Sequence, residues 1–151
     1  FGVNFIWNHT SEYVVTGIES GDAVDFAGEV LYPDDRANLN LSYGYEDWNF
    51  TWRMRYWASS VDSVEGNNYN FTNFAPLEEY NEFPSVIYHD VSASYAISDD
   101  MNISLVVRNA FDKQPPVANQ SSVNGGTGIN TVSEAYDVTG RYMQASFTAR
   151  F

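Results

Sequence analysis

Residues 37–57 read ANLNLSYGYEDWNFTWRMRYW, and two alternating segments in this stretch decide the fold class. The first segment, 37–45, places Ala, Leu and Tyr on one face and Asn, Ser and Gly on the other. The second, 48–57, alternates large apolar residues with Asn, Thr and two arginines. Because successive side chains of a β-strand point to opposite faces, the stretch predicts two antiparallel strands joined by a tight turn.

The same period of two recurs in four further segments. These segments are residues 1–8, 89–97, 101–111 and 141–151. Together with the first stretch they give six predicted strands, and almost no part of the chain has the period of a helix. We therefore expect an all-β protein whose strands each have one apolar and one polar face.

The connections between the predicted strands alternate in length. Two are short turns, near 46–47 and 98–100, and three are long loops, at about 9–36, 58–87 and 112–136. The long ones are rich in Asn, Ser, Gly, Asp and Glu, which is typical of loops. Short turns at one end and long loops at the other predict an up-and-down antiparallel meander of three hairpins, the pattern of outer-membrane barrels.

The composition excludes several classes of protein. Aromatic residues make up 17% of the 151 residues, while the mean hydropathy is only -0.35, which suits strands with two different faces. The net charge is -13 with a single lysine, so a nucleic-acid-binding face is not expected. The chain has no cysteine, and no apolar run approaches the 18 residues of a membrane-spanning helix.

Arg53, Arg55 and Arg108 lie on predicted polar faces in the middle or at the end of strands. A soluble β-sandwich and a membrane barrel both produce alternating strands, and both remain open on this pattern alone. Aromatic residues near both ends of the predicted strands favour the barrel, where they form girdles at the bilayer surfaces. In a barrel we expect the three arginines to face the lumen, as part of its wall or in contact with a plug or an anionic ligand.

Three motifs carry a resemblance to a known family. The segment LVVRNAFDKQPP, 105–116, resembles the penultimate strand and following loop of TonB-dependent outer-membrane receptors, with Ala110 where that family usually has Leu. The segment YDVTGRYMQASFTARF, 136–151, resembles the last strand of the family. Residues 32–57 resemble one of its hairpins. The motifs occur in the family's order and cover nearly the whole chain.

The resemblance implies a transmembrane antiparallel β-barrel of 22 strands, of which residues 1–151 would be the last six. An N-terminal plug and the earlier strands would belong to a longer protein, which fits a chain that begins inside an alternating segment and has too few strands to close. The implied function is active uptake of a scarce nutrient (a siderophore, haem, vitamin or oligosaccharide) across the outer membrane of a Gram-negative bacterium. TonB would act through the missing plug.

The last strand is expected to be an assembly signal. In the family that the chain resembles, a terminal Phe is recognised by the barrel-assembly machinery, and here the alternation runs through Met143 and Phe147 to Phe151. The physical basis is that an unpaired strand edge adds to another sheet edge.

The second long loop contains the candidate ligand-contact residues. Rings set among Asn and Glu suit stacking on sugars or on aromatic siderophores, and these rings are Tyr69, Phe71, Phe74, Tyr80 and Phe83. The alternative is that they pack the loop against its neighbours. For Asn109, Asp112 and Lys113 we expect a structural role, with Asp112 accepting hydrogen bonds where a strand becomes a loop.

No catalytic, cofactor or metal site is predicted. His9 and His89 lack acidic partners at a suitable spacing, and no nucleophile or phosphate-loop motif occurs. The acidic first and second loops match no calcium-loop spacing, and the expected use of their charge is solubility of exposed loops or divalent bridging to lipopolysaccharide phosphates. Lipid is the other expected partner of the barrel surface. Two other functions remain open: a passive porin-like barrel and a soluble carbohydrate-binding sandwich.

Overall fold

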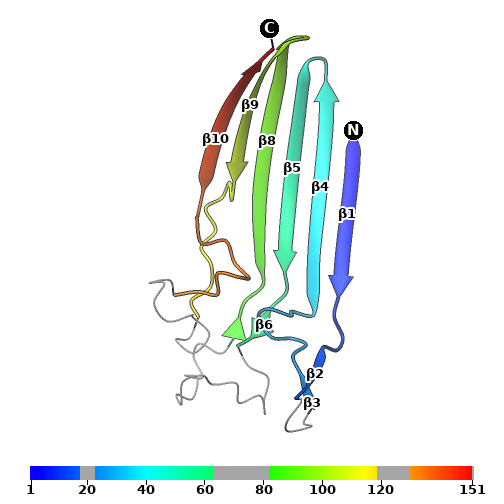
Figure 1. Ribbon diagram of the computed structural model, residues 1–151, viewed down its shortest axis with the longest axis vertical. Helices are drawn as coiled ribbons and strands as arrows, with labels where there is room; N and C mark the ends of the chain where they lie inside the picture. Colours follow the sequence, from blue (N-terminus) through cyan, green and yellow to red (C-terminus); the bar gives the residue numbers. More distant parts are fainter. Residues whose placement is uncertain (18–22, 63–81, 119–129, 151) are drawn as a thin grey trace.

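A computed structural model describes residues 1–17, 23–62, 82–118 and 130–150. Its main feature is a six-stranded antiparallel sheet in the order β1-β4-β5-β8-β9-β10 (Figure 1). The strands are β1 (Gly2–His9), β4 (Asp35–Tyr45), β5 (Trp48–Trp57), β8 (Val86–Ser98), β9 (Met101–Arg108) and β10 (Tyr142–Ala149). The predicted all-β fold and its antiparallel strands are confirmed.

The register of the sheet keeps the predicted faces together. Leu39 pairs with Phe5 on β1 and with Met54 on β5, whereas Asn40 pairs with Asn4 and Arg53. Because side chains directly opposite each other lie on the same side of a sheet, an apolar face and a polar face continue across neighbouring strands. A shift of one residue would exchange these faces, so the alternation itself specifies the register.

The long loops contain short strands that the period did not predict. One two-stranded sheet pairs β2 (Val14–Thr16) with β3 (Ala23–Asp25), and another pairs β6 (Ser60–Val61) with β7 (Glu82–Phe83). Strands of two or three residues are too short to show an alternating pattern. All the long loops lie at one end of the sheet, and both chain termini lie at the other end (Figure 1).

The boundaries of the main strands match the prediction only for β5, and they differ most for β8 and β9. β8 begins at Val86, before the predicted 89, and β9 ends at Arg108, before the predicted 111. β9 ends there because Asn109 has a positive φ of 47°, which no regular strand contains. The third long connection runs over residues 109–141, and β10 begins at Tyr142.

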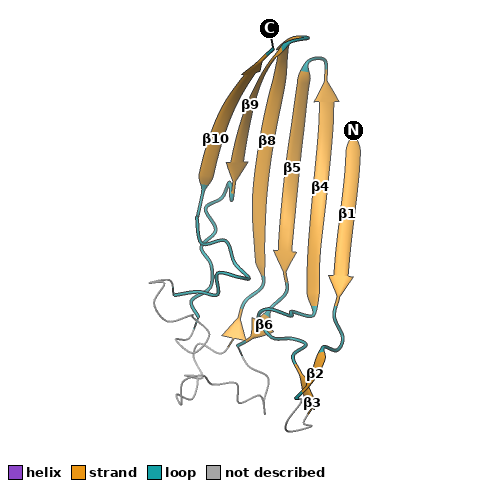
Figure 2. Ribbon diagram, viewed as in Figure 1, coloured by secondary structure: helices purple, strands orange, loops and turns teal. Residues whose placement is uncertain are grey.

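The buried core lies at the loop end of the sheet. It combines residues of all three long loops with the first residues of β8, and its members are Val30, Phe83, Val86, Tyr88, Ala118, Val132, Ala135 and Tyr136. Among the described residues no second large sheet covers the six-stranded one, which forms a single layer (Figure 2). β1 and β10 do not pair with each other, so the sheet is open and no barrel closes.

The part of the chain that the structure describes contains no helix long and apolar enough to cross a lipid bilayer.

Candidate functional site

The apolar face of the six-stranded sheet is exposed over its whole width. Phe5 on β1 is 63% exposed, Leu105 on β9 is 48% exposed and Phe147 on β10 is 61% exposed. Trp52 in the centre of the sheet is still 41% exposed. A contiguous apolar surface of this extent marks a face that another apolar phase or protein covers.

Aromatic side chains gather on the apolar face near the short turns. The ring of Trp48 stacks on Phe50 at 5.6 Å between centroids and lies 4.7 Å from the ring of Tyr95. Tyr43 and Tyr45 lie beside them, because they pair with Phe50 and Trp48 in the register of β4 and β5. The tyrosine and tryptophan rings combine an apolar body with a polar group, which suits the boundary between an apolar phase and water.

A second group of rings lies nearer to the loops. The indole N–H of Trp7 donates to Asp35 at 2.9 Å, and His9 Nδ1 lies 2.9 Å from the same carboxylate oxygen.

The apolar face of β5 has an aromatic residue at each end, Trp48 and Tyr56. From Trp48 to Tyr56 the chain advances eight residues, which corresponds to about 26 Å along a strand. A distance of this order matches the apolar band of a transmembrane barrel, which is about 25 Å tall.

The second histidine also lies on the apolar face. The indole N–H of Trp52 donates to His89 Nδ1 at 3.2 Å, and the His89 ring lies 4.9 Å from the edge-on ring of Phe111. His9 and His89 therefore belong to two separate ring clusters. Within the described ranges, no three His, Cys, Asp or Glu side chains gather as a metal site.

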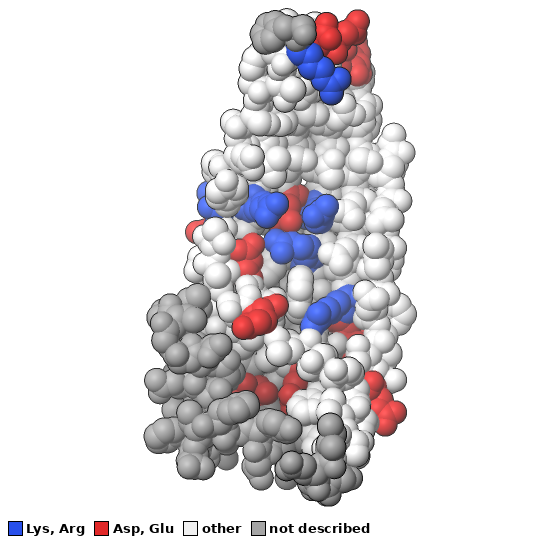
Figure 3. All heavy atoms as spheres, in the orientation of Figure 1, with Lys and Arg blue, Asp and Glu red and all other residues white. Residues whose placement is uncertain are grey.

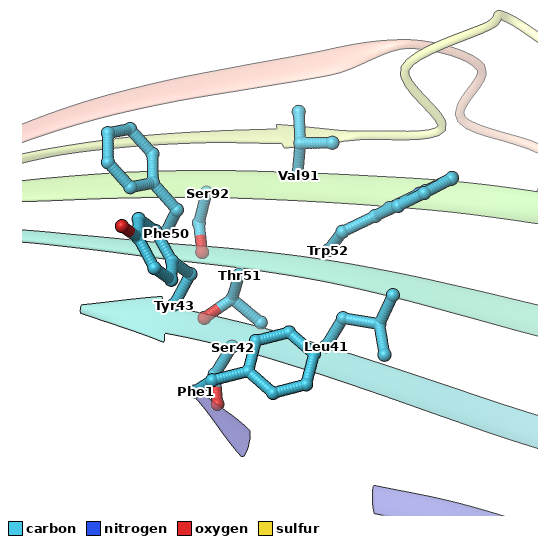
Figure 4. Close-up of a pocket in the computed structure, with 9 residues that line it drawn as sticks. All are labelled: Phe1, Leu41, Ser42, Tyr43, Phe50, Thr51, Trp52, Val91 and Ser92. Atoms are coloured by element: carbon cyan, nitrogen blue, oxygen red, sulfur yellow. The ribbon is translucent and has the colours of Figure 1, made fainter. Parts of the chain in front are cut away.

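A hollow of about 350 Å³ is visible on the apolar face (Figure 4). Apolar side chains from three strands and from the first residue surround it, namely Phe1, Leu41, Tyr43, Phe50, Trp52 and Val91. The lining also includes Ser42, Thr51 and Ser92 but no charged residue, so the hollow offers mainly apolar contact. A second hollow, of about 580 Å³, lies among the loops and is lined by polar residues that include Asp34 and Glu82.

The polar face contains an ion-pair network centred on Arg55. Its guanidinium donates to both carboxylate oxygens of Asp90, at 3.0 and 3.2 Å, and to Asp137 at 3.3 Å. It also lies over the ring of Tyr88, 5.2 Å from the ring centroid. The Tyr88 hydroxyl accepts a hydrogen bond from the backbone N–H of Asp137 at 3.3 Å, so the network fastens the third loop to the sheet.

Arg53 and Arg108 lie on the same polar face as Arg55. Arg53 Nε donates to Asn40 at 2.8 Å, and the Asn40 amide donates in turn to Asn4 at 3.4 Å. Arg108 is exposed, and it pairs in register with Tyr142. The three arginines predicted for one face do share it, and the lumen that this face would line stays a prediction.

The segment after β9 has the predicted structural role. Asn109 is fully buried, and its side chain both accepts from the backbone N–H of Lys113 at 2.8 Å and donates to the Lys113 carbonyl at 3.0 Å. The Asn109 N–H donates to Asp90 at 3.0 Å. Asp112 has a φ of 53° and accepts from the backbone N–H of Arg141 at 2.9 Å, as expected of a residue at a strand-to-loop transition.

Phe83 is not an open ligand-contact residue in this structure. It is 1% exposed, and its ring lies 6.0 Å from that of Tyr136 in the loop core. The ring lies there because β7 pairs with β6 and turns it inward, an arrangement that the sequence pattern did not indicate. Burial also raises the pKa of Tyr136. The other four ring candidates, Tyr69, Phe71, Phe74 and Tyr80, lie outside the described residues.

The predicted assembly residues fall on the last strand. Met143 and Phe147 lie on the apolar face of β10 and are 60% and 61% exposed. Phe151 lies outside the described residues. The assembly role itself stays a prediction.

The first loop contains an aromatic cluster that the sequence pattern missed. Tyr13 and Tyr32 stack at 4.2 Å, and the ring of Phe26 lies 6.4 Å from Tyr13. Backbone hydrogen bonds from Ala27 and Tyr13 lower the pKa of the Asp25 carboxyl beside them. These residues are up to 19 positions apart in the sequence, so only the β2–β3 hairpin reveals their contact.

A scan against models of known protein families and a search of curated proteins found no match for this chain.

Proposed function

We propose that this chain is a wall segment of a transmembrane β-barrel in the outer membrane of a Gram-negative bacterium. The carrying observation is the contrast between the two faces of one single-layered sheet: an exposed apolar face with aromatic residues near its ends, and a polar face with the arginines. In a barrel the apolar face contacts lipid and the polar face lines the interior. The opposite orientation would place each arginine in lipid at a cost of about 2–4 kcal/mol near the midplane.

The open sheet edges fit this proposal if further strands complete the barrel. β1 and β10 each have an edge without a partner strand among the described residues. Unpaired backbone N–H and C=O groups are costly in lipid, and barrels of this kind have eight or more strands. In the proposed protein, these six strands would be the last of a total of 22 that enclose an internal plug, and the edge of β10 would pair with the first strand.

The proposed activity of the complete protein is TonB-dependent uptake of a scarce nutrient. Its support is the resemblance of three segments, 32–57, 105–116 and 136–151, to that receptor family. The structural role of Asn109 and Asp112 adds to this support, since it explains why those residue types recur at the end of a penultimate strand. TonB, the barrel-assembly machinery, lipopolysaccharide and a small nutrient are the proposed partners.

Two measurements test the proposal at separate levels. For location, the full-length protein should fractionate with outer membranes, require detergent for extraction and migrate differently on gels before and after heating. A protein that stays soluble without detergent would instead support the sandwich alternative.

For transport, a strain that lacks the protein should grow less well on one limiting iron or carbon source. Restoring the protein should rescue growth only when TonB is present. Rescue in a strain without TonB would overturn the receptor proposal and favour a passive porin-like barrel.

A further inference from the structure

The polar face of the sheet has a charge opposite to that of the chain as a whole. Arg36, Arg53, Arg55 and Arg108 lie on it with Asp90, which gives four positive charges minus one, or +3. Adding Asp137, which reaches Arg55 from the third loop, leaves +2. The whole chain has a net charge of -13. Figure 3 shows the basic side chains gathered over the middle of the sheet.

Arg55 neutralises the only acidic side chain that the polar face of the strands provides. Both oxygens of Asp90 accept from Arg55, and Oδ1 also accepts from the backbone N–H of Asn109. The Asp90 carboxylate is therefore satisfied by partners other than its neighbours in the register. Within the described residues, no ion pair joins Asp90 to Arg53 or Arg108 on the two adjacent strands.

Those two arginines, Arg53 and Arg108, lie on either side of Asp90. Arg53 is the register partner of Asp90, and the pairing of Val91 with Val107 places Arg108 opposite Asp90 at the next position of the ladder. Two strand spacings of about 4.8 Å separate their backbones by about 10 Å, which the two long side chains can span. Both residues are exposed.

Both guanidinium groups retain hydrogen-bond donors. Arg53 uses Nε on Asn40, which leaves the N–H groups of its two Nη atoms. Arg108 has no side-chain partner within the described part of the chain. Two guanidinium groups without a carboxylate partner among the described residues match the planar oxygen pairs of carboxylates and phosphates.

We propose that Arg53 and Arg108 form an anion-binding site for a small ligand with carboxylate or phosphate groups. The proposal deepens the proposed uptake function and rests on it for the biological role, since it assigns a chemical class to the ligand. Arg55 and Asp90 position the site. Because both oxygens of the Asp90 carboxylate accept from Arg55, the guanidinium groups of Arg53 and Arg108 stay available to the ligand. Acidic residues dominate elsewhere in the chain, so anions have no comparable alternative surface on the strands.

Calorimetric titration of the purified full-length protein tests the site, with citrate as the carboxylate probe and inorganic phosphate as the phosphate probe. We expect saturable binding of at least one probe at low ionic strength and weaker binding as salt is added. Arg53→Gln and Arg108→Gln should each weaken binding about tenfold, since each removes charge-assisted hydrogen bonds. Arg53→Lys should have a smaller effect, because it keeps the charge.

Arg150→Gln is the matched control, since it removes one positive charge outside the six strands. It should bind the probe as the unchanged protein does, and circular dichroism should show the same β-structure in every variant. Absence of binding for both probes, or equal binding by the double variant Arg53→Gln/Arg108→Gln, would overturn the site. Because binding is measured on the purified protein, its result is independent of the fractionation experiment. The anion site can be overturned while the outer-membrane location holds, and the location can be overturned while the protein still binds the probe.

Discussion

The Oδ1 atom of Asp112 accepts a hydrogen bond from the backbone N–H of Arg141 across 29 positions of the sequence. The two residues stand at opposite ends of the long connection between β9 and β10, and the bond holds those ends together immediately before β10 begins. Gly140 makes the close approach feasible: it has a φ of 73°, and a Cβ there would lie 3.2 Å from Asp112 Oδ1. The contact therefore helps to set the register of the last strand.

Asp112→Ala should destabilise the protein by about 2 kcal/mol. It removes the bond to Arg141 and places Ala at a positive φ, and each effect costs about 1 kcal/mol or slightly more. Asp112→Asn is the matched control, since Asn tolerates this backbone region and its amide oxygen accepts the same bond. Urea unfolding checks the difference. Equal losses of unfolding free energy in the two variants would show that the hydrogen bond from Arg141 to Asp112 does not stabilise the protein.

Arg55→Met should destabilise the protein more strongly, by about 3 kcal/mol, because it leaves the largely buried carboxylates of Asp90 and Asp137 without their cation. The side chains of these two acids are each only 16% exposed. Arg53→Met provides the comparison, since Arg53 makes a single hydrogen bond to a neutral partner. If unfolding experiments showed the two variants to be equally stable, the ion pairs of Arg55 would add no more to the free energy of unfolding than the single hydrogen bond of Arg53.

Phe83→Ala should act on stability and not directly on a ligand. Phe83 is 1% exposed in the loop core, so the loss of its ring should cost about 3–5 kcal/mol. Phe83→Leu should recover most of this, because it refills much of the volume. Limited proteolysis of the loops together with urea unfolding measures both effects. Normal stability combined with weaker nutrient binding would restore the ligand-contact interpretation.

The alternating pattern predicted the main sheet because one physical constraint acts along every strand. Residues such as Leu39 and Met54 must share a face, and the same period fixes which residues pair. The polar positions of Arg53, Arg55 and Arg108 followed from the same rule. The tight turns were visible because Glu46 and Asp47 interrupt the alternation.

The loop contacts could not be read in the same way. Arg55 and Asp137 are 82 positions apart, and no local pattern connects them. Phe83 looked like a ligand-contact ring because its neighbours in sequence are polar, whereas its burial depends on Tyr136 in another loop. Such contacts arise from how three loops pack together, and a period along one strand contains no information about that packing.

The most direct test of the account is which face of the sheet contacts lipid. The chain has no cysteine, so single spin labels can be attached at Leu105→Cys on the apolar face and at Ser104→Cys on the polar face of β9. In membranes, electron paramagnetic resonance should show the label at 105 accessible to oxygen and shielded from a water-soluble nickel complex, with the opposite result at 104. Equal accessibility at both positions, or the reverse pattern, would contradict the membrane-wall account.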